Sequence, residues 1–293
     1  MTRSRDRFHV LVASDGSAPA RAAVKAATVF PWPRGARASG VVAWDAAAHI
    51  RTPAGIRKDI LATIDRMAAE TEATLRERWP DARCAVVSGA PDVAILARAR
   101  RVGAQVIVAG STGRGAFGRL LVGSVTRALA RRATASLLVV KGRPASFDRL
   151  VLGFDGSRNA RRAIDFVARL SPPRGGQVTV VRAVAPEPAP HRVHLPPAAR
   201  RIGQERAATL ATEARRRARV ETEAAARPLA RAGWKVRVDV RVGAALDTVL
   251  AMARGAHLVV VGARGTSGLR GLLLGSVATG ALDRARVPVL IAR

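Results

Sequence analysis

Residues 106–124, VIVAGSTGRGAFGRLLVGS, decide the fold of this chain, because they join an apolar strand, a glycine-rich loop and the start of a helix. The same frame returns at residues 258–276 as LVVVGARGTSGLRGLLLGS. In both copies a G-x-x-G is followed, after nine residues, by a Gly-Ser pair. Such a loop turns backbone N–H groups toward an anion, and the helix behind it adds a partial positive charge. The sequence therefore predicts two phosphate-binding loops.

The rest of the chain repeats as well. An Asp-Gly-Ser turn at Asp15 returns at Asp155, 140 residues later, whereas the two glycine loops lie 152 residues apart. The second copy therefore holds additional residues, which we place in the Pro- and His-rich stretch 185–197. Each copy has the usual size of a domain, so we expect one domain at residues 1–146 and another at residues 147–293.

Apolar runs alternate with helical patterns in each copy. The runs read as continuous Val, Ile and Leu, which is typical of a parallel sheet covered by helices on both faces. We therefore expect an α/β fold with two tandem open parallel sheets of five strands each. The expected strands are residues 8–13, 38–44, 85–88, 105–109 and 136–140, then 150–154, 178–184, 236–242, 257–261 and 287–291. The expected helices include residues 18–30, 52–78, 91–101 and 124–132, and a long helix over about 199–232.

Composition limits the class of protein. The chain has 293 residues, of which 48% are hydrophobic, and no apolar run approaches the length of a membrane span. We find no signal-peptide pattern at the N-terminus. The single cysteine, Cys84, excludes an intrachain disulfide and fits a reducing compartment. We expect a cytoplasmic protein with no membrane partner and no metal site, since the five histidines are scattered.

The net charge of +29 raises the question of a nucleic-acid partner. The excess is divided evenly between the two copies, and only four of the fifty basic residues are Lys. This pattern favours an arginine-rich composition throughout the chain over a dedicated binding module. Aromatic residues are scarce, so the stacking platforms of single-strand binders are missing. We do not expect a nucleic-acid partner, although a basic nucleic-acid- or ribosome-associated protein remains an alternative.

Asp15 and Asp155 each follow the first strand of their copy. Ligands of open α/β sheets bind beyond the carboxyl ends of the strands, where the glycine loop also emerges. A carboxylate at this place can accept hydrogen bonds from ribose hydroxyls while the loop holds phosphates. The alternative is that each Asp only caps the following helix. We favour the nucleotide role because of the position of the loop.

These residues resemble the universal stress protein family in its tandem two-domain form, over essentially the whole chain. The resemblance implies the strand order 3-2-1-4-5 and adenine held by backbone at the end of the second strand, here Trp44 and Val184. Trp44 is larger than the residue usual there, so it would stack on adenine or crowd it. The implied nucleotide-binding residues are Ala13, Asp15, Trp44, Gly110, Ser111, Thr112, Gly113, Arg114, Gly115, Gly123, Ser124 and Val125 in the first copy, and Gly153, Asp155, Val184, Gly262, Ala263, Arg264, Gly265, Thr266, Ser267, Gly275, Ser276 and Val277 in the second.

The expected function is that of an ATP-binding regulatory protein of the stress response. The ligand would be ATP, or else ADP or AMP, together with Mg²⁺. Neither loop contains the Gly-Lys-Ser/Thr of a P-loop, and no carboxylate or His is placed to orient an attacking water. We therefore expect no catalytic residue, with a slow ATPase or an autophosphorylating enzyme as the alternative. We also expect the final strands, 136–140 and 287–291, to pair the two domains, and a homodimer of whole chains is a further alternative.

Overall fold

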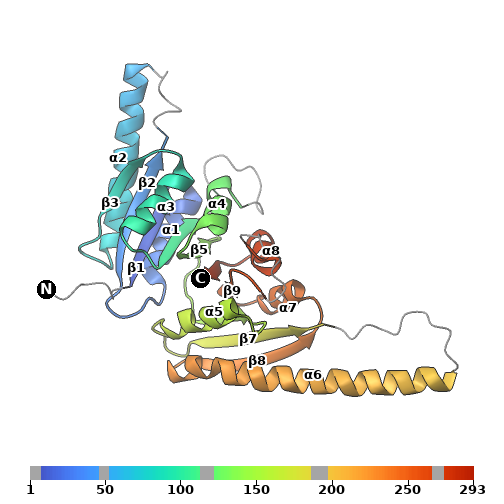
Figure 1. Ribbon diagram of the computed structural model, residues 1–293. Helices are drawn as coiled ribbons and strands as arrows, with labels where there is room; N and C mark the ends of the chain where they lie inside the picture. The colour runs from blue at the N-terminus through green and yellow to red at the C-terminus, as the bar shows by residue number, and fades with distance from the viewer. Residues whose placement is uncertain (1–7, 46–52, 113–121, 186–196, 266–273) are drawn as a thin grey trace.

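The computed structural model describes residues 8–45, 53–112, 122–185, 197–265 and 274–293, which form one ten-stranded sheet (Figure 1). The order of its strands is β3-β2-β1-β4-β5-β10-β9-β6-β7-β8. The strands are β1 (His9–Ser14), β2 (Arg37–Trp44), β3 (Cys84–Ser88), β4 (Val106–Gly110), β5 (Ser136–Val140), β6 (Arg149–Gly153), β7 (Gln177–Val184), β8 (Lys235–Val242), β9 (Leu258–Gly262) and β10 (Val289–Ala292).

Each half of the sheet has the order 3-2-1-4-5 with parallel neighbours, as the resemblance implied. The expectation of two separate five-stranded sheets is corrected, because the halves are joined. Strands β5 and β10 pair antiparallel, and Leu138 lies opposite Leu290 in the register. Both strands are buried along their whole length. Pairing removes the open edge that each would otherwise leave in the middle of the molecule.

Helices cover both faces of the sheet, and alternate residues of a strand contact different layers. In β1, Val10 and Val12 belong to the same buried cluster as Ala23 of α1, whereas Leu11 packs in the cluster that holds Leu129 of α4. The described helices are α1 (Ala18–Val29), α2 (Ala54–Arg76), α3 (Pro91–Arg101), α4 (Ser124–Arg132), α5 (Arg158–Ala168), α6 (Pro197–Arg231), α7 (Ala245–Met252) and α8 (Ser276–Arg284). Within this part of the chain, no helix is both long and apolar enough to cross a membrane.

An aromatic cluster joins the two halves on the α1 and α5 face. The ring centroids of Phe30 and Trp32 lie 4.2 Å apart, and Phe30 also contacts Phe147 of the connecting segment at 4.8 Å. Phe8 of the first half reaches Phe166 of the second at 5.8 Å. Rings of this size remove much apolar surface from water, so the halves share one core rather than touching at a solvated interface.

Two cations reach across the seam, the place where β5 of one half pairs with β10 of the other, in opposite directions. Lys141, which follows β5, donates from Nζ to the carbonyl oxygen of Ala285 at 2.7 Å, at the C-terminal end of α8. Arg293, which follows β10, donates to the carbonyl oxygen of Ala130 at the end of α4. A cation beside the last carbonyls of a helix is favourable. Burial lowers the pKa of Lys141 to about 8.

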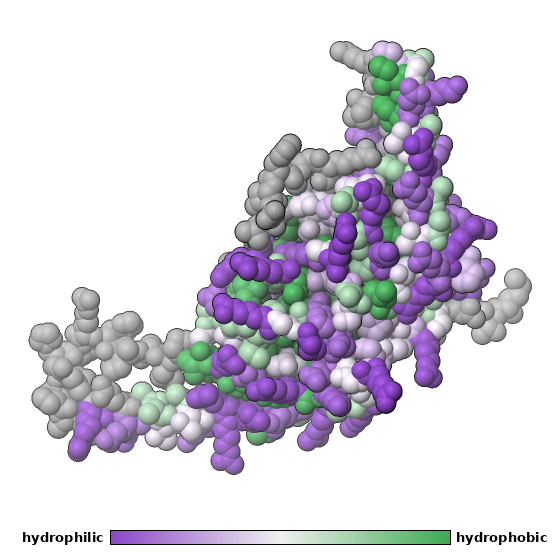
Figure 2. Space-filling view, turned by 180° about the vertical axis from the view of Figure 1, so that it is seen from behind, coloured by the Kyte–Doolittle hydropathy of each residue, from purple (hydrophilic) through white to green (hydrophobic). Residues whose placement is uncertain are grey.

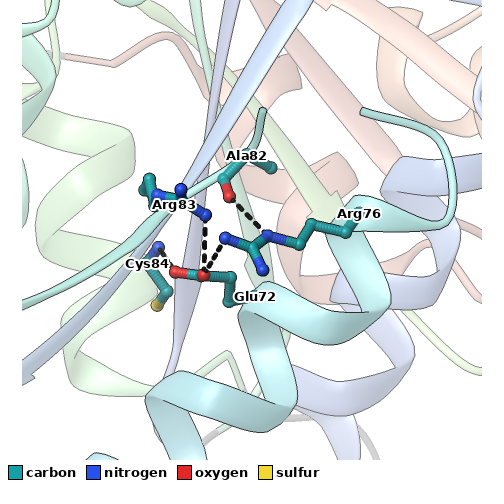
Figure 3. A network of polar contacts seen from close by, with 5 residues as sticks. All are labelled: Glu72, Arg76, Ala82, Arg83 and Cys84. Carbon is teal, nitrogen blue, oxygen red and sulfur yellow. Dashed lines mark hydrogen bonds and ion pairs between the residues drawn. The ribbon is translucent and has the colours of Figure 1, made fainter. Parts of the chain in front are cut away.

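A second polar network fixes α2 to β3 within the first half (Figure 3). The carboxylate of Glu72 accepts a hydrogen bond from the backbone N–H of Cys84 at 2.8 Å and lies 2.6 Å from the Arg76 guanidinium. Arg83 reaches the same carboxylate at 3.2 Å. Burial raises the pKa of the Cys84 thiol to about 12, so this cysteine is held as an unreactive thiol.

Hydrophilic side chains are spread over most of the face shown in Figure 2 rather than gathered at one place. This agrees with the even division of charge between the copies in the sequence. The long helix α6 extends beyond the sheet (Figure 1). Along this helix Arg217 pairs with Glu213, and Arg219 pairs with Glu223. Exposed pairs one helical turn apart are typical of a solvated helix surface.

Candidate functional site

Each half has a cavity at the carboxyl ends of its central strands, of about 530 Å³ in the first half and about 470 Å³ in the second. The structure brings most of the predicted binding residues to these two cavities. The first is lined by Ala13, Asp15, Gly110, Thr112, Gly123, Ser124 and Val125. The second is lined by Gly153, Asp155, Gly262, Arg264, Gly265, Gly275, Ser276 and Val277.

The aspartates sit in matching turns, and the helix-capping role falls to the serines that follow them. The Asp15 carboxylate accepts a hydrogen bond from the backbone N–H of Ser17 at 3.0 Å, and Asp155 does the same with Ser157 at 2.9 Å. The hydroxyl oxygens of Ser17 and Ser157 accept from the N–H groups of the third helical residues and so cap α1 and α5. The aspartates thus hold their turns and face the cavities at the same time.

The first glycine of each loop has a structural reason to be glycine. A Cβ on Gly110 would lie 2.8 Å from the backbone carbon of Pro19, and one on Gly262 would lie 2.6 Å from that of Asn159. Strand β4 therefore passes directly against the start of α1, and β9 against the start of α5. This contact requires glycine whether or not an anion binds.

Gly265, in the glycine loop of the second half, lies against the carboxylate of Asp155. A Cβ on Gly265 would come within 2.5 Å of Oδ2 of Asp155. The loop and the aspartate therefore form one wall of the second cavity. Its counterpart Gly113 lies outside the described residues, as do Arg114, Gly115, Thr266 and Ser267, so the structure does not test those expectations.

The helices α4 and α8 begin at the cavities without a side-chain cap. Gly123 donates its N–H to the carbonyl of Ser111, and Gly275 donates to Ala263, each at 2.8 Å, so these two donors close the loop itself. The next N–H groups, at the start of each helix, have no partner within their own helix. They belong to Ser124 and Val125 in the first half and to Ser276 and Val277 in the second, all of which line the cavities.

Comparison with known proteins identifies this arrangement. The model of the universal stress protein family matches the chain twice, at residues 7–141 and 146–293. The chain belongs to the universal stress protein family.

Relatives and solved structures agree with this assignment. The universal stress protein Rv2005c of Mycobacterium tuberculosis is 32% identical over 202 residues, which cover 65% of this chain and 62% of the relative. Rv2623 of the same organism is 34% identical over 143 residues, covering 48% of this chain and 46% of the relative. The matched region thus spans less than two thirds of each relative. A universal stress protein from Archaeoglobus fulgidus shares the fold, with a TM-score of 0.65, 18% identity and coverage of 97% and 98% of the two chains.

Four described residues that were predicted to bind the nucleotide do not line the cavities of this universal stress protein, namely Ser111, Ala263, Trp44 and Val184. Ser111 and Ala263 donate their backbone N–H groups to Val140 and Ala292 at 3.0 Å, in addition to accepting from the glycines described above. Their backbone groups therefore tie the loop to the neighbouring final strand, β5 or β10. They position the loop, and neither residue lines its cavity.

The expectation that Trp44 stacks on adenine or crowds it is wrong. The side chain of Trp44 packs with Ile64 and Ala68 of α2, on the other face of the sheet from the cavity. Its carbonyl accepts a hydrogen bond from Gly89, and the carbonyl of Val184 accepts one from Gly243. Because side chains alternate along a strand, the residue before Trp44 faces the cavity instead.

Sequence reasoning missed the residues that form the far wall of each cavity. Ala43 lines the first cavity and Ala183 the second, one position before the residues predicted. Ile95 of α3 and Val249 of α7 add an apolar surface. The alternation of side chains in the second strand carried the signal for the alanines, whereas the helical residues depend on how α3 and α7 pack.

The charge at the two cavities differs. Arg264 lines the second cavity, whereas Thr112 occupies the corresponding place in the first. Burial, and then the nearby positive charge of Arg264, lower the pKa of Arg293. Arg264 therefore adds a positive charge to the second cavity, which favours an anion there.

Proposed function

We propose that this universal stress protein binds one adenine nucleotide in each half and that the bound nucleotide regulates its part in the stress response. ATP is the expected ligand, with ADP or AMP as alternatives, accompanied by Mg²⁺. The observation that carries the proposal is the uncapped N-terminus of α4 or α8 at a cavity that also holds an aspartate. Helix N–H groups suit phosphate, and a carboxylate suits ribose hydroxyls.

The dimensions and lining of both cavities support a nucleotide. Their volumes of about 530 and 470 Å³ fall in the range of small-molecule sites, roughly 300–1,000 Å³. Ala43 and Ala183 are small enough to leave room for a flat base beside the apolar side chains of Ile95 and Val249. Mg²⁺ would neutralise phosphate charge when bound, since it prefers phosphate oxygens and water to an all-protein cage.

Binding without rapid turnover is the activity that the lining favours. Among the described residues that line each cavity, the aspartate is the one acidic side chain, and no histidine is present. Each aspartate is also engaged by the N–H of its own turn. A general base must lie within hydrogen-bonding reach of the attacking water, and no second group fills that role here. Sustained release of phosphate above a buffer control would instead support the slow ATPase.

Calorimetric titration of the whole chain with ATP tests the proposal. We expect two sites per chain, and we expect Asp15→Asn and Asp155→Asn each to remove or weaken one of them. Asparagine retains an oxygen that can accept from Ser17 or Ser157, so the turns should persist. Asp165→Asn, on the exposed side of α5, is the matched control. Absence of binding, or two unchanged sites in both variants, would contradict the proposal.

A further inference from the structure

A further cavity lies in the first half, on the opposite face of the sheet from the candidate nucleotide site. It has a volume of about 450 Å³ and is enclosed by α1, α2 and the connecting segment at Arg143 and Pro144. Ser14, at the end of β1, lines both this cavity and the nucleotide cavity. We call it the α1–α2 cavity. Its size is close to that of the two candidate nucleotide sites.

The α1–α2 cavity does not follow from the fold alone, because the second half differs at the equivalent place. Phe154 stands where the first half has Ser14. The guanidinium groups of Arg161 and Arg182 lie 5.9 and 6.0 Å from the centroid of its ring. Arg182 is held there by Glu221 of α6 at 2.6 Å. Arg161 corresponds to Arg21 of the first half, so the difference lies in Phe154 and Arg182, which stand where the first half has the smaller Ser14 and Val42.

The walls of the α1–α2 cavity carry opposite charges. Arg21 and Lys25 of α1, with Arg143, form a basic side, and Glu70 and Glu77 of α2 form an acidic side. Among the described residues, none of these five side chains forms an ion pair. Glu72 on the same helix, by contrast, is neutralised by two arginines (Figure 3). The two sides are therefore not joined by an ion pair in this part of the chain, and Arg21 donates instead to the carbonyl oxygen of Gly16.

The floor of the cavity offers a hydroxyl group. Thr71 is 5% exposed and lines the cavity. Ser14 is 7% exposed, and its hydroxyl oxygen accepts only a long contact of 3.4 Å from Gly16. Hydrogen bonds inside a low-dielectric cavity are stronger than in water, so a ligand that bonds to Thr71 would be oriented by it. Ala22 and Met67 supply apolar surface between the charged sides.

We propose that the α1–α2 cavity binds a small zwitterion with a carboxylate and an ammonium group, which is the chemistry of a free amino acid. The carboxylate would face Arg21, Lys25 and Arg143, and the ammonium group would face Glu70. A ligand with one charge only would leave the opposite side of the cavity unpaired, which disfavours simple anions and simple amines. This site is independent of the nucleotide sites and adds a second kind of ligand to the first half.

The test is a calorimetric titration of the whole chain with each of the twenty L-amino acids. We expect at least one to bind, and its N-acetyl and its amide derivative, which lack one charge each, to bind at least about tenfold more weakly. Glu70→Gln and Thr71→Val should weaken binding while the nucleotide titration is unchanged. Asp65→Asn, on the exposed side of α2, is the matched control and should bind as the wild type does.

Three results would overturn this proposal. One is that no amino acid binds at concentrations up to about 10 mM, which corresponds to affinity too weak for a built site. Another is that the N-acetyl and amide derivatives bind as tightly as the free amino acid, or that Glu70→Gln and Thr71→Val both bind the amino acid as tightly as the wild type does. The third is competition by saturating ATP, which would place the amino acid in the nucleotide cavity. Thermal melts of Thr71→Val, which is close to isosteric, confirm that a lost signal is not a lost fold.

Discussion

The two halves of this universal stress protein keep one set of contacts and change another. Both have an aspartate turn, a serine cap, a glycine packed against a helix start and an uncapped helix at the cavity. Both also have an ion pair between the two helices on the cavity face, Asp92 with Arg132 and Asp247 with Arg284, each at 2.8 Å. The repeated contacts lie at the two cavities and between the helices beside them.

The contacts that differ between the two halves lie around the cavities. In the first half, the hydroxyl of Thr126 donates to the carbonyl of Gly110 at 2.8 Å, whereas the second half has Ala278 at that position. The second half instead has Arg264 at its cavity and Phe154 behind its first strand. The halves therefore differ in the charge and the surroundings of the site rather than in its frame. Variants made in pairs, one in each half, can separate the two kinds of contact.

The largest expected effect is at the seam, where the halves meet. Leu138 and Leu290 are fully buried and face each other across β5 and β10. Leu138→Asp or Leu290→Asp would bury a charge without a partner, so we expect the free energy of unfolding to fall by about 4 kcal/mol or more. Nucleotide binding should weaken in both halves, because each final strand holds its loop. Urea denaturation and ATP titration measure the two effects.

Expression of residues 1–146 alone gives the complementary result. The exposed edge of β5 should make this fragment self-associate in sedimentation experiments. A monomeric fragment that binds ATP as tightly as the whole chain would show that the halves are independent.

The next largest effect separates the packing role of the loop glycines from any binding role. Gly110→Ala and Gly262→Ala place a methyl group within 3 Å of backbone atoms that cannot move easily. We expect each to lower the free energy of unfolding by about 1–3 kcal/mol, with or without nucleotide. Gly103→Ala is not a suitable control because that residue has a positive φ, whereas Gly55→Ala, with open space around it, is. Equal stability of the wild type and Gly110→Ala would contradict the packing argument.

A smaller effect on stability, and a larger one on binding, is expected at the helix starts. Gly123 and Gly275 have ordinary φ values of −62° and −74°, so the substitution to Val is not forbidden by backbone conformation. A branched side chain there would still occupy the approach of phosphate to the helix. Gly123→Val and Gly275→Val should each weaken their own site at least about tenfold and leave the fold close to intact.

The same experiment distinguishes backbone from side-chain recognition of phosphate. Arg264→Ala should weaken only the second site, and by less than Gly275→Val does. The reverse order would show that phosphate is held by the arginine and not by the helix start.

The smallest expected effect concerns Lys141, one of the two cations that cross the seam. Because the pKa of Lys141 falls to about 8 in the folded chain, the unfolded chain binds more protons above that pH. The titration of Lys141 should therefore raise the free energy of unfolding as the pH increases from about 8 to 10.5. Lys141→Arg should flatten this part of the profile of stability against pH, measured by urea denaturation. An unchanged slope in the variant would show that another group titrates there.

The sequence predicted the repeated frame, the strand order within each half and the place of the cavities. The frame and the place of the cavities depend on spacing and on the period of apolar residues, which are local properties, whereas the strand order came from the resemblance to the family. It failed at Trp44, because the resemblance pointed to one strand position and the alternation of side chains to the one before it. It also missed the packing of Gly110 against Pro19, since a phosphate loop and a close helix contact both require glycine.

The α1–α2 cavity was beyond sequence reasoning for a different reason. The difference between Ser14 and Phe154 is visible in the sequence. Its consequence depends on how far α2 stands from α1 and on where Arg182 extends, and long-range packing of this kind leaves no periodic signal.

The antiparallel pairing of β5 with β10 determines how the two candidate nucleotide cavities are oriented. Strands run parallel within each half and reverse direction at the seam, and the sheet twists along its length, so the carboxyl ends of the two halves point in different directions (Figure 1). The two candidate nucleotide cavities, which lie at these ends, therefore open in different directions. A molecule bound at the mouth of one cavity therefore leaves the mouth of the other accessible.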